Sequence, residues 1–276
     1  MTIFDEEKIC DALPFTHIEV HSQIHSTNDR AIELLRQSAL KSPALIIAES
    51  QTKGRGQRSR KWWSDAGSLT FSYIPSPTTE TRTDKRPTTP SGLISLASAL
   101  AVANALASIE PTQVFEIKWP NDVMVNQSKI AGILVESVST ETDLFSVIGI
   151  GANINNSNMP TLQAMDDQRK SMGTSTATSL AQVSGNANSL SEALIKILVE
   201  LKKQISIVNE NPLEIVEQFN QVLMYREQAI LVASPSGTTL KATCLGITAN
   251  GGLRIKTENQ IKIIHSGSVQ KPDSSG

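Results

Sequence analysis

The sequence contains few cysteines and no excess of charge of either sign. Its 276 residues include two cysteines, Cys10 and Cys244, which are far apart and outside any metal-ligand spacing. A disulfide framework or a cysteine-ligated zinc site is therefore not expected. The 25 basic and 27 acidic side chains leave a net charge of −2, which excludes the broad positive field that would attract nucleic acid or an anionic membrane. Any cationic binding site must be local.

We also expect no segment that would carry the chain to or across a membrane. The first residues, MTIFDEEKICDALPF, place acids where a secretory signal would have bases. No apolar run is expected to approach the roughly 18 residues that a bilayer requires. The sequence therefore predicts a cytoplasmic protein, because a reducing compartment suits two free thiols.

The periodicity of apolar residues predicts an α+β fold, with helices packed on a mixed sheet. Before the long helix at Leu93–Ile109, we expect a β-α-β unit whose helix is capped at Ser26-Thr27-Asn28. The predicted strands are Thr16–Val20, Ala44–Glu49, Val114–Lys118, Lys129–Glu136 and Leu144–Gly151, and the later helices are Leu190–Ile207 and Leu213–Leu223.

The pattern changes near Tyr225. The runs AILVAS, TLKATCLGIT, GLRIKT and QIKIIHSGSV are separated by turn residues, which is typical of a small β-barrel. We therefore predict a catalytic domain at 1–225 and a small C-terminal domain at 226–276 with a disordered tail. The segment from Pro75 to Ser91 is crowded with Pro, Thr and charge, and we expect it to be a mobile surface excursion without chemistry.

A basic loop, QTKGRGQRSRKWW at 51–63, is the most informative segment. Gly54 and Gly56 allow the backbone to approach a ligand closely, and consecutive N–H groups in such a turn can bind an anion. Arg55, Arg58 and Arg60 add forked donors for phosphate or carboxylate. The loop lacks the Walker and Rossmann patterns, so it indicates a polyphosphate that is held in another way.

Two other interpretations of this loop stay open. A solvated basic loop would explain the scattered arginines about equally well. An RNA-binding loop could use Trp62 and Trp63 to stack on bases, although the near-neutral net charge disfavours it.

A second pattern joins the turn KWPND at 118–122 to the strand KIAGILVE at 129–136. Pro120 with the following Asn-Asp is typical of a structural turn, and Lys129 alone would be a solvated strand end. Gly132 lies inside an apolar strand, however, where a missing side chain often marks the close approach of a ligand. Lys129 would then border the same site.

Two further motifs are weak when each is taken alone. His25-Ser26-Thr27-Asn28-Asp29 is typical of a helix N-cap. In the run IGIGANIN at 148–155, the glycines leave room for either a ligand or another backbone.

In their order along the chain, these motifs resemble those of the biotin protein ligase family, from about His17 to Val269. The most specific parts are the GRG-x-R loop followed by RKW, and the spacing from KWPND to KxAG. The resemblance implies a class II synthetase-like catalytic module and an SH3-like C-terminal barrel. It implies activation of biotin by ATP and Mg²⁺ to biotinyl-5'-AMP, and transfer to a lysine of a biotin carboxyl carrier protein. It also implies a monomer or a ligand-linked homodimer.

The resemblance assigns roles to individual positions. The implied catalytic residues are Lys129 and Arg55, which would face the reacting carboxyl and the α-phosphate. No metal ligand is placed, because Mg²⁺ would be carried by ATP. The implied biotin-binding residues are Ser26, Thr27, Asn28, Gln51, Arg55, Gly56, Gln57, Lys129 and Gly132, and the implied ATP-binding residues are Arg58, Arg60, Asn121 and Asn153.

The sequence departs from the family pattern in two places. Gln57 and Ser59 stand where many relatives have Arg and Gly, which puts the retention of the adenylate in doubt. Only about 15 residues precede the first predicted strand, so a DNA-binding helix-turn-helix and repressor activity are not expected. The alternatives are a lipoate or octanoate ligase-like enzyme and, in a different class, a nucleic-acid or peptide-binding module built on the terminal barrel.

Overall fold

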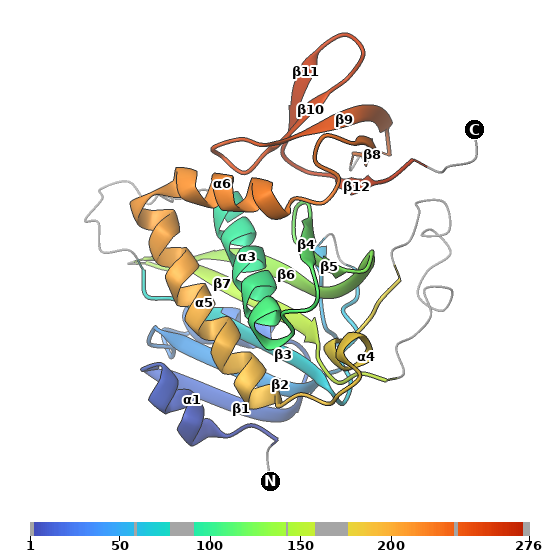
Figure 1. Cartoon of the computed structure of the whole chain (residues 1–276). Coiled ribbons are helices and arrows are strands. Elements are labelled where there is room, and N and C mark those ends of the chain that lie inside the picture. The colour runs from blue at the N-terminus through green and yellow to red at the C-terminus, as the bar shows by residue number, and fades with distance from the viewer. Residues whose placement is uncertain are drawn as a thin grey trace.

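Two β-sheets organise the structure, one in each part of the chain (Figure 1). This computed structural model describes residues 3–57, 60–77, 91–141, 143–157, 176–234 and 237–272. The first sheet has seven strands in the order β1-β2-β3-β7-β6-β5-β4. Its strands are β1 His17–Ile24, β2 Ala44–Gln51, β3 Ser68–Ile74, β4 Phe115–Lys118, β5 Asp122–Val125, β6 Ser128–Ser139 and β7 Leu144–Asn153.

The sheet is mixed, as predicted. β1 and β2 pair in parallel and are connected in the chain by the helix α2 Thr27–Arg36. This arrangement confirms the β-α-β unit at the start of the chain. The other neighbours in the sheet pair antiparallel. Ser26 begins α2 as its N-cap, where its side chain accepts a hydrogen bond from Asp29 N at 3.3 Å.

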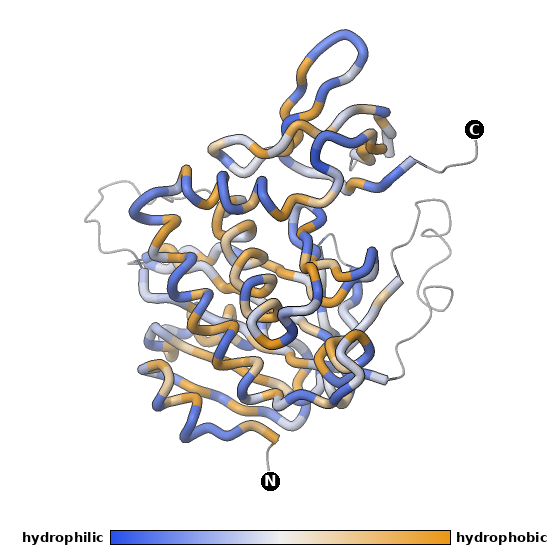
Figure 2. The backbone as a smooth tube through the Cα atoms, in the orientation of Figure 1, coloured by the Kyte–Doolittle hydropathy of each residue, from blue (hydrophilic) through white to orange (hydrophobic). Residues whose placement is uncertain are grey.

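Helices cover both faces of this sheet. Leu45 and Ile47 of β2 belong to the core under α3 Ser91–Ile109 and α5 Leu190–Glu210, whereas Ile46 packs under α2. Because both faces are buried, β2 is a nearly continuous apolar run. Figure 1 shows α3 and α5 lying side by side across one face. In Figure 2, hydrophilic and hydrophobic residues alternate along α5, as expected for a helix with one exposed side.

The composition of α3 corrects the expectation that no apolar run approaches the length of a membrane span. Its residues Gly92–Ile109 form an 18-residue window with a mean hydropathy of 1.8, long and apolar enough to cross a membrane by length and composition. Of this window, 67% is buried within the protein, between the sheet and α5. Packing on two sides accounts for the apolar composition.

Several elements were not predicted from the sequence. These include the short helices α1 Glu6–Ala12 and α4 Leu180–Ser184, and the strand β3. β3 reads SLTFSYI and is buried along its whole length, and its alternation of polar and apolar residues is a strand signal that could have identified it. The helix α6 Pro212–Val222 matches its prediction closely.

The second sheet is antiparallel and lies beside the end of α6 (Figure 1). The indole nitrogen of Trp119 donates to Gly251 O at 3.1 Å, and Ile247 N donates to Asn220 Oδ1 at 3.0 Å. These bonds attach the sheet to the turn after β4 and to α6. In the order β11-β10-β9-β8-β12, its strands are β8 Ala229–Ala233, β9 Thr239–Ile247, β10 Leu253–Lys256, β11 Ile261–Ile264 and β12 Ser268–Gln270.

Three expectations concern residues outside the described ranges. They are the roles of Arg58 and Ser59, most of the excursion from Pro75 to Ser91, and the end of the C-terminal tail.

Candidate functional site

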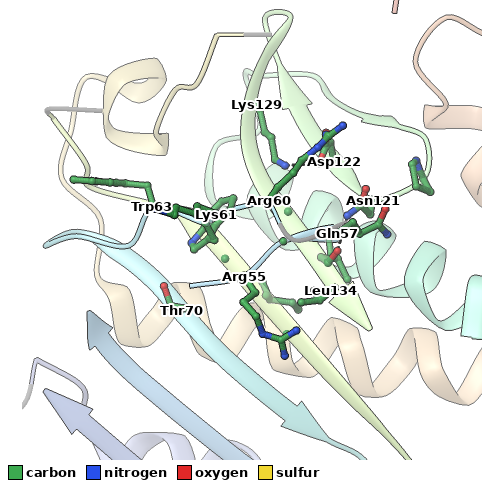
Figure 3. Close-up of a pocket in the computed structure, with 18 of the residues that line it drawn as sticks. Arg55, Gln57, Arg60, Lys61, Trp63, Thr70, Asn121, Asp122, Lys129 and Leu134 are labelled. Atoms are coloured by element: carbon green, nitrogen blue, oxygen red, sulfur yellow. Dashed lines mark hydrogen bonds and ion pairs between the residues drawn. The ribbon is translucent and has the colours of Figure 1, made fainter. Parts of the chain in front are cut away.

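A cavity of ≈ 260 Å³ lies where the basic loop, the turn after β4 and the ends of β6 and β7 meet. The structure brings together every predicted site residue that it describes, since all of them line this cavity. These residues are Ser26, Thr27, Asn28, Gln51, Arg55, Gly56, Gln57, Arg60, Asn121, Lys129, Gly132 and Asn153. Figure 3 labels five of them: Arg55, Gln57, Arg60, Asn121 and Lys129.

One end of the cavity is polar and neutral. Gln51 Oε1 accepts hydrogen bonds from Thr27 N at 2.7 Å and from Thr27 Oγ1 at 3.3 Å. Because a backbone N–H can only donate, the atom that faces Thr27 must be the amide oxygen. The Nε2 group of Gln51 is thereby left as a donor, and both Gln51 and the buried Ser26 line the cavity.

Asn28 is fixed by contacts on both sides of its amide. Its Oδ1 accepts from Ser72 Oγ at 2.6 Å, and its Nδ2 donates to Glu136 Oε2 at 2.8 Å. The side chain fits because residue 149 is glycine, where an added Cβ would lie 2.3 Å from Asn28 Oδ1. Both polar ends are therefore used within the protein, and Asn28 is only 4% exposed.

The basic loop folds back on itself as a narrow hairpin. Trp62 N donates to Gly54 O at 2.9 Å, and Gly56 N donates to Arg60 O at 2.7 Å. Between these bonds, Arg55 Nη2 donates to Glu136 Oε2 at 2.8 Å and to Asp29 Oδ1 at 2.6 Å. Figure 3 shows the Arg55 side chain pointing away from Lys129 and Asp122, so its charge is directed at carboxylates of the protein.

The other end of the cavity is cationic. Lys129 Nζ donates a hydrogen bond to Asp122, and Lys118 is the residue opposite Asp122 in the antiparallel register of β4 and β5. Although burial opposes ionisation, the charges of Lys129 and Lys118 hold the pKa of Asp122 below its usual value. Burial lowers the pKa of Lys118, and the nearby charges of Lys129 and Arg60 lower it further against the opposing effect of Asp122. Three bases around one carboxylate leave a local positive charge that suits a polyphosphate.

Trp62 forms part of the cavity wall beside Lys129. The Lys129 ammonium lies 5.6 Å from the centroid of its ring, within cation–π range. An added Cβ at Gly132 would lie 3.3 Å from Trp62 Cζ3 and 3.0 Å from Lys129 Nζ. The glycine at 132 therefore makes room for two side chains of the site. The indole Nε1 is buried and has no hydrogen-bond partner among the described residues.

Two asparagines border the cationic end. Asn121 Nδ2 donates to Ile133 O at 2.6 Å, and Asn153 Nδ2 donates to Thr178 O at 3.1 Å. These bonds orient each amide, and no described residue donates to either Oδ1 atom. The described residues contain no group of three or more His, Cys, Asp or Glu side chains placed to hold a metal ion. A hard cation could still use these amide oxygens together with phosphate oxygens, as Mg²⁺ often does.

Several functional candidates were missed by reasoning from the sequence. Glu136 and Asp29 received no role, Trp62 was considered only as a base-stacking residue, and Lys118 and Asp122 were considered only as parts of a turn. The β12 segment 267–270 also lines the cavity, and no local pattern in the sequence indicated that.

Comparisons with known proteins agree with this arrangement. Residues 20–153 match the biotin/lipoate A/B protein ligase family, and residues 227–271 match the biotin protein ligase C terminal domain. The bifunctional ligase/repressor BirA of Bacillus subtilis is 30% identical over 263 residues, which cover 92% of this chain and 74% of the relative. The biotin–[acetyl-CoA-carboxylase] ligase of Mycobacterium tuberculosis is 26% identical, with 96% and 94% of the two chains covered.

A solved structure supports the same relationship. Biotin protein ligase from Aquifex aeolicus in complex with biotin and ATP superimposes with a TM-score of 0.73 at 26% sequence identity. The match covers 93% of this chain and 98% of that one.

Proposed function

The chain belongs to the biotin protein ligase family, and we propose that it activates biotin with ATP to biotinyl-5'-AMP and transfers the biotinyl group to a lysine of a biotin carboxyl carrier protein. The observation that carries the proposal is the pairing of a neutral polar end with a cationic end in one cavity. Biotin needs both, because its ureido ring is uncharged and its carboxylate must meet the triphosphate.

The neutral end suits a ureido group. Gln51 Nε2 offers a donor to the ureido oxygen, and the hydroxyls of Ser26 and Thr27 can accept from or donate to the ring. None of these groups carries a charge that would have to be desolvated. Asn28 contributes mainly by holding Ser72 and Thr27 in place, since Ser72 Oγ lies 2.8 Å from Thr27 Oγ1.

In the first step, a carboxylate oxygen of biotin attacks the α-phosphorus of ATP, and the bond to the pyrophosphate oxygen breaks. Lys129, Lys118 and Arg60 stabilise the negative charge that develops on the phosphate oxygens. Alignment of the two anions by these fixed cations supplies much of the remaining effect. Mg²⁺ bound with ATP would neutralise part of the phosphate charge, held by phosphate oxygens and the amide oxygens of Asn121 and Asn153.

In the second step, the ε-amine of the acceptor lysine attacks the acyl carbon of the mixed anhydride, and AMP leaves. Exposed adenylate would be lost to water, so the hairpin that contains Gly56 and Gln57 also serves to exclude solvent. We also propose that the catalytic domain ends and the C-terminal domain begins near Tyr225. The break between α6, which ends at Val222, and β8, which begins at Ala229, supports this boundary. We place the reaction in the cytoplasm, where ATP and reduced thiols are found together.

Pyrophosphate release with three separate acids tests the substrate. We expect ATP-dependent release with biotin, and much less with lipoate or octanoate, because neither of these has a ureido group for Gln51 and Thr27. Gln51→Ala should depress release with biotin, while Gln113→Ala, at a half-buried amide outside the cavity that accepts from Asn126 Nδ2, should not. Equal or greater turnover with lipoate would show that the assignment of biotin as the substrate is wrong.

A further inference from the structure

The tip of the basic loop is attached to the protein through an arginine. The segment from Thr52 to Lys61 contains no apolar side chain, so burial of apolar surface cannot hold it in place. Its internal hydrogen bonds join Gly54 to Trp62 and Gly56 to Arg60, and these bonds shape the hairpin without fixing it to the sheet. At the base of the segment, Thr52 N and Lys53 N donate to Ile24 O and His25 O, both at 2.9 Å. Nearer the tip, the Arg55 side chain makes the connection, to Asp29 of α2 and Glu136 of β6.

Glu136 connects two sides of the cavity. Its Oε1 accepts from Arg55 Nη1 and Nη2, both at 3.1 Å, and its Oε2 accepts from Arg55 Nη2 and from Asn28 Nδ2, both at 2.8 Å. Both partners line the cavity, whereas Glu136 is absent from the described residues that line it. One carboxylate therefore orients a residue of the loop and a residue at the neutral end.

We propose that Glu136 is a positioning residue for adenylate formation, which holds the loop over the bound acid through Arg55 and aligns the neutral end through Asn28. The proposal rests on the proposed function, because it concerns the same cavity. The side chain of Glu136 is 27% exposed and that of Arg55 is 36% exposed, so this pair is more sheltered from solvent than an ordinary surface ion pair.

Charge counting supports a holding role for Arg55 as well. One guanidinium faces two carboxylates, Glu136 and Asp29, so these three groups together present no net positive charge to a phosphate. Arg55 Nε is also buried without a hydrogen-bond partner among the described residues. The charge that meets the phosphates then comes from Lys129, Lys118 and Arg60, at the other end of the cavity.

Steady-state pyrophosphate release by Glu136→Gln tests the proposal. The glutamine keeps the shape of the side chain but replaces one acceptor oxygen with a donor that faces Arg55 or Asn28. We expect KM for biotin to rise about tenfold or more, with kcat changed less than about threefold, as expected when uniform binding is lost. KM for ATP should change little. Asp29→Asn removes the other carboxylate that Arg55 contacts, and it should raise KM for biotin by a smaller factor. The Asp29 side chain is 51% exposed, so this substitution should leave the fold intact.

The matched control is Glu19→Gln. Glu19 accepts from Arg30 Nε and Nη2, both at 3.0 Å, so the substitution breaks a comparable pair away from the cavity. It should lower the thermal unfolding temperature and leave KM for biotin unchanged. If Glu136→Gln keeps the parental KM for biotin while the parent is active, the positioning role is wrong.

A second measurement needs no activity. Limited trypsin digestion without ligand should cut Glu136→Gln faster than the parent at Lys53, Arg55, Arg60 and Lys61. The reason is that the variant loses the ion pair between Glu136 and Arg55 that holds the loop. Equal rates would overturn the proposal. If the parent releases no pyrophosphate with biotin, the proposed function fails, and the digestion rates still decide the role of Glu136.

Discussion

The indole of Trp62 occupies the space beside Gly151 that any larger residue would need, since an added Cβ there would lie 2.2 Å from Trp62 Cε2. Gly151 lies in β7 opposite Gly132 of β6, so the two glycines form a flat floor for the ring. In the sequence, the glycines of the run at 148–155 indicated room for a ligand or another backbone. In the structure, Gly151 makes room for the Trp62 side chain instead. The indole in turn lies beside Lys129.

Gly151→Ala should therefore displace Trp62 and disturb Lys129. We expect a destabilisation of about 1–3 kcal/mol, as for overpacking of a core, and a larger loss of adenylation than of stability. Thermal unfolding and pyrophosphate release would measure the two effects. Gly92→Ala is the control, because its Cβ would lie 3.4 Å from Asn250 O. Parental activity in Gly151→Ala would mean that the position of the ring does not matter.

Lys129→Ala should depress adenylate formation by about 10²–10³ while the protein stays folded, because one charged donor to the reacting phosphate is lost. Asp122 would lose its hydrogen-bonded partner, so a modest decrease in stability is also expected. Single-turnover formation of the adenylate is the appropriate measurement. Lys202→Ala, on the exposed side of α5, should behave as the parent. If the Lys129→Ala variant forms the adenylate at the parental single-turnover rate, Lys129 has no role in the reaction and is only a solvated strand end.

The site could be predicted largely because its residues come from short uninterrupted motifs. The cap at 26–28, the loop at 51–63 and the turn at 118–122 each carry their signal within a few residues. The sheet then brings them together, since β6 and β7 are neighbours and the cap begins the helix that packs on them. Local periodicity likewise predicted the main helices and most of the strands.

Partnerships between distant segments could not be predicted in this way. Glu136 meets Arg55 across 81 residues of sequence, and Ser72 meets Asn28 across 44. Periodicity determines which face of an element is buried, but it does not determine which side chains meet on that face. The contribution of β12 to the cavity depends on how the second sheet docks, and the bond from Trp119 to Gly251 that fixes this docking spans 132 residues.

Glu19 should make stability depend on acidic pH. Hydrogen bonds from Arg30, together with those from His21 and His17, lower the pKa of Glu19 from 4.5 to about 2, although burial opposes the shift. Because the folded protein favours the ionised form, this stabilisation is fully present above about pH 4.5 and is lost as the pH falls toward 2. Urea unfolding at a series of pH values should show a steeper loss of stability for the parent than for Glu19→Gln over this window. Parallel curves would contradict the assignment.

Binding of biotin and ATP should protect the basic loop from trypsin. The loop carries Lys53, Arg55, Arg60 and Lys61 without apolar residues between them, so about 1–2 kcal/mol of backbone entropy per residue opposes its ordering. A bound anion pairs with Arg60, which lines the cavity, and satisfies loop N–H groups, which links closure to binding. Cleavage in the loop should therefore slow with biotin plus ATP.

The segment between Arg82 and Arg86, which the sequence predicts to be a surface excursion without chemistry, provides the internal comparison. Its cleavage should proceed at the same rate with and without ligand, because no ligand contact is expected there. Ligand protection of both segments would indicate a general stabilisation of the protein by binding. Protection of neither would mean that the loop does not close over the cavity. Only selective protection at Lys53–Lys61 matches a gate, because the cavity that it covers is lined by Arg55, Gly56 and Gln57 of that same loop.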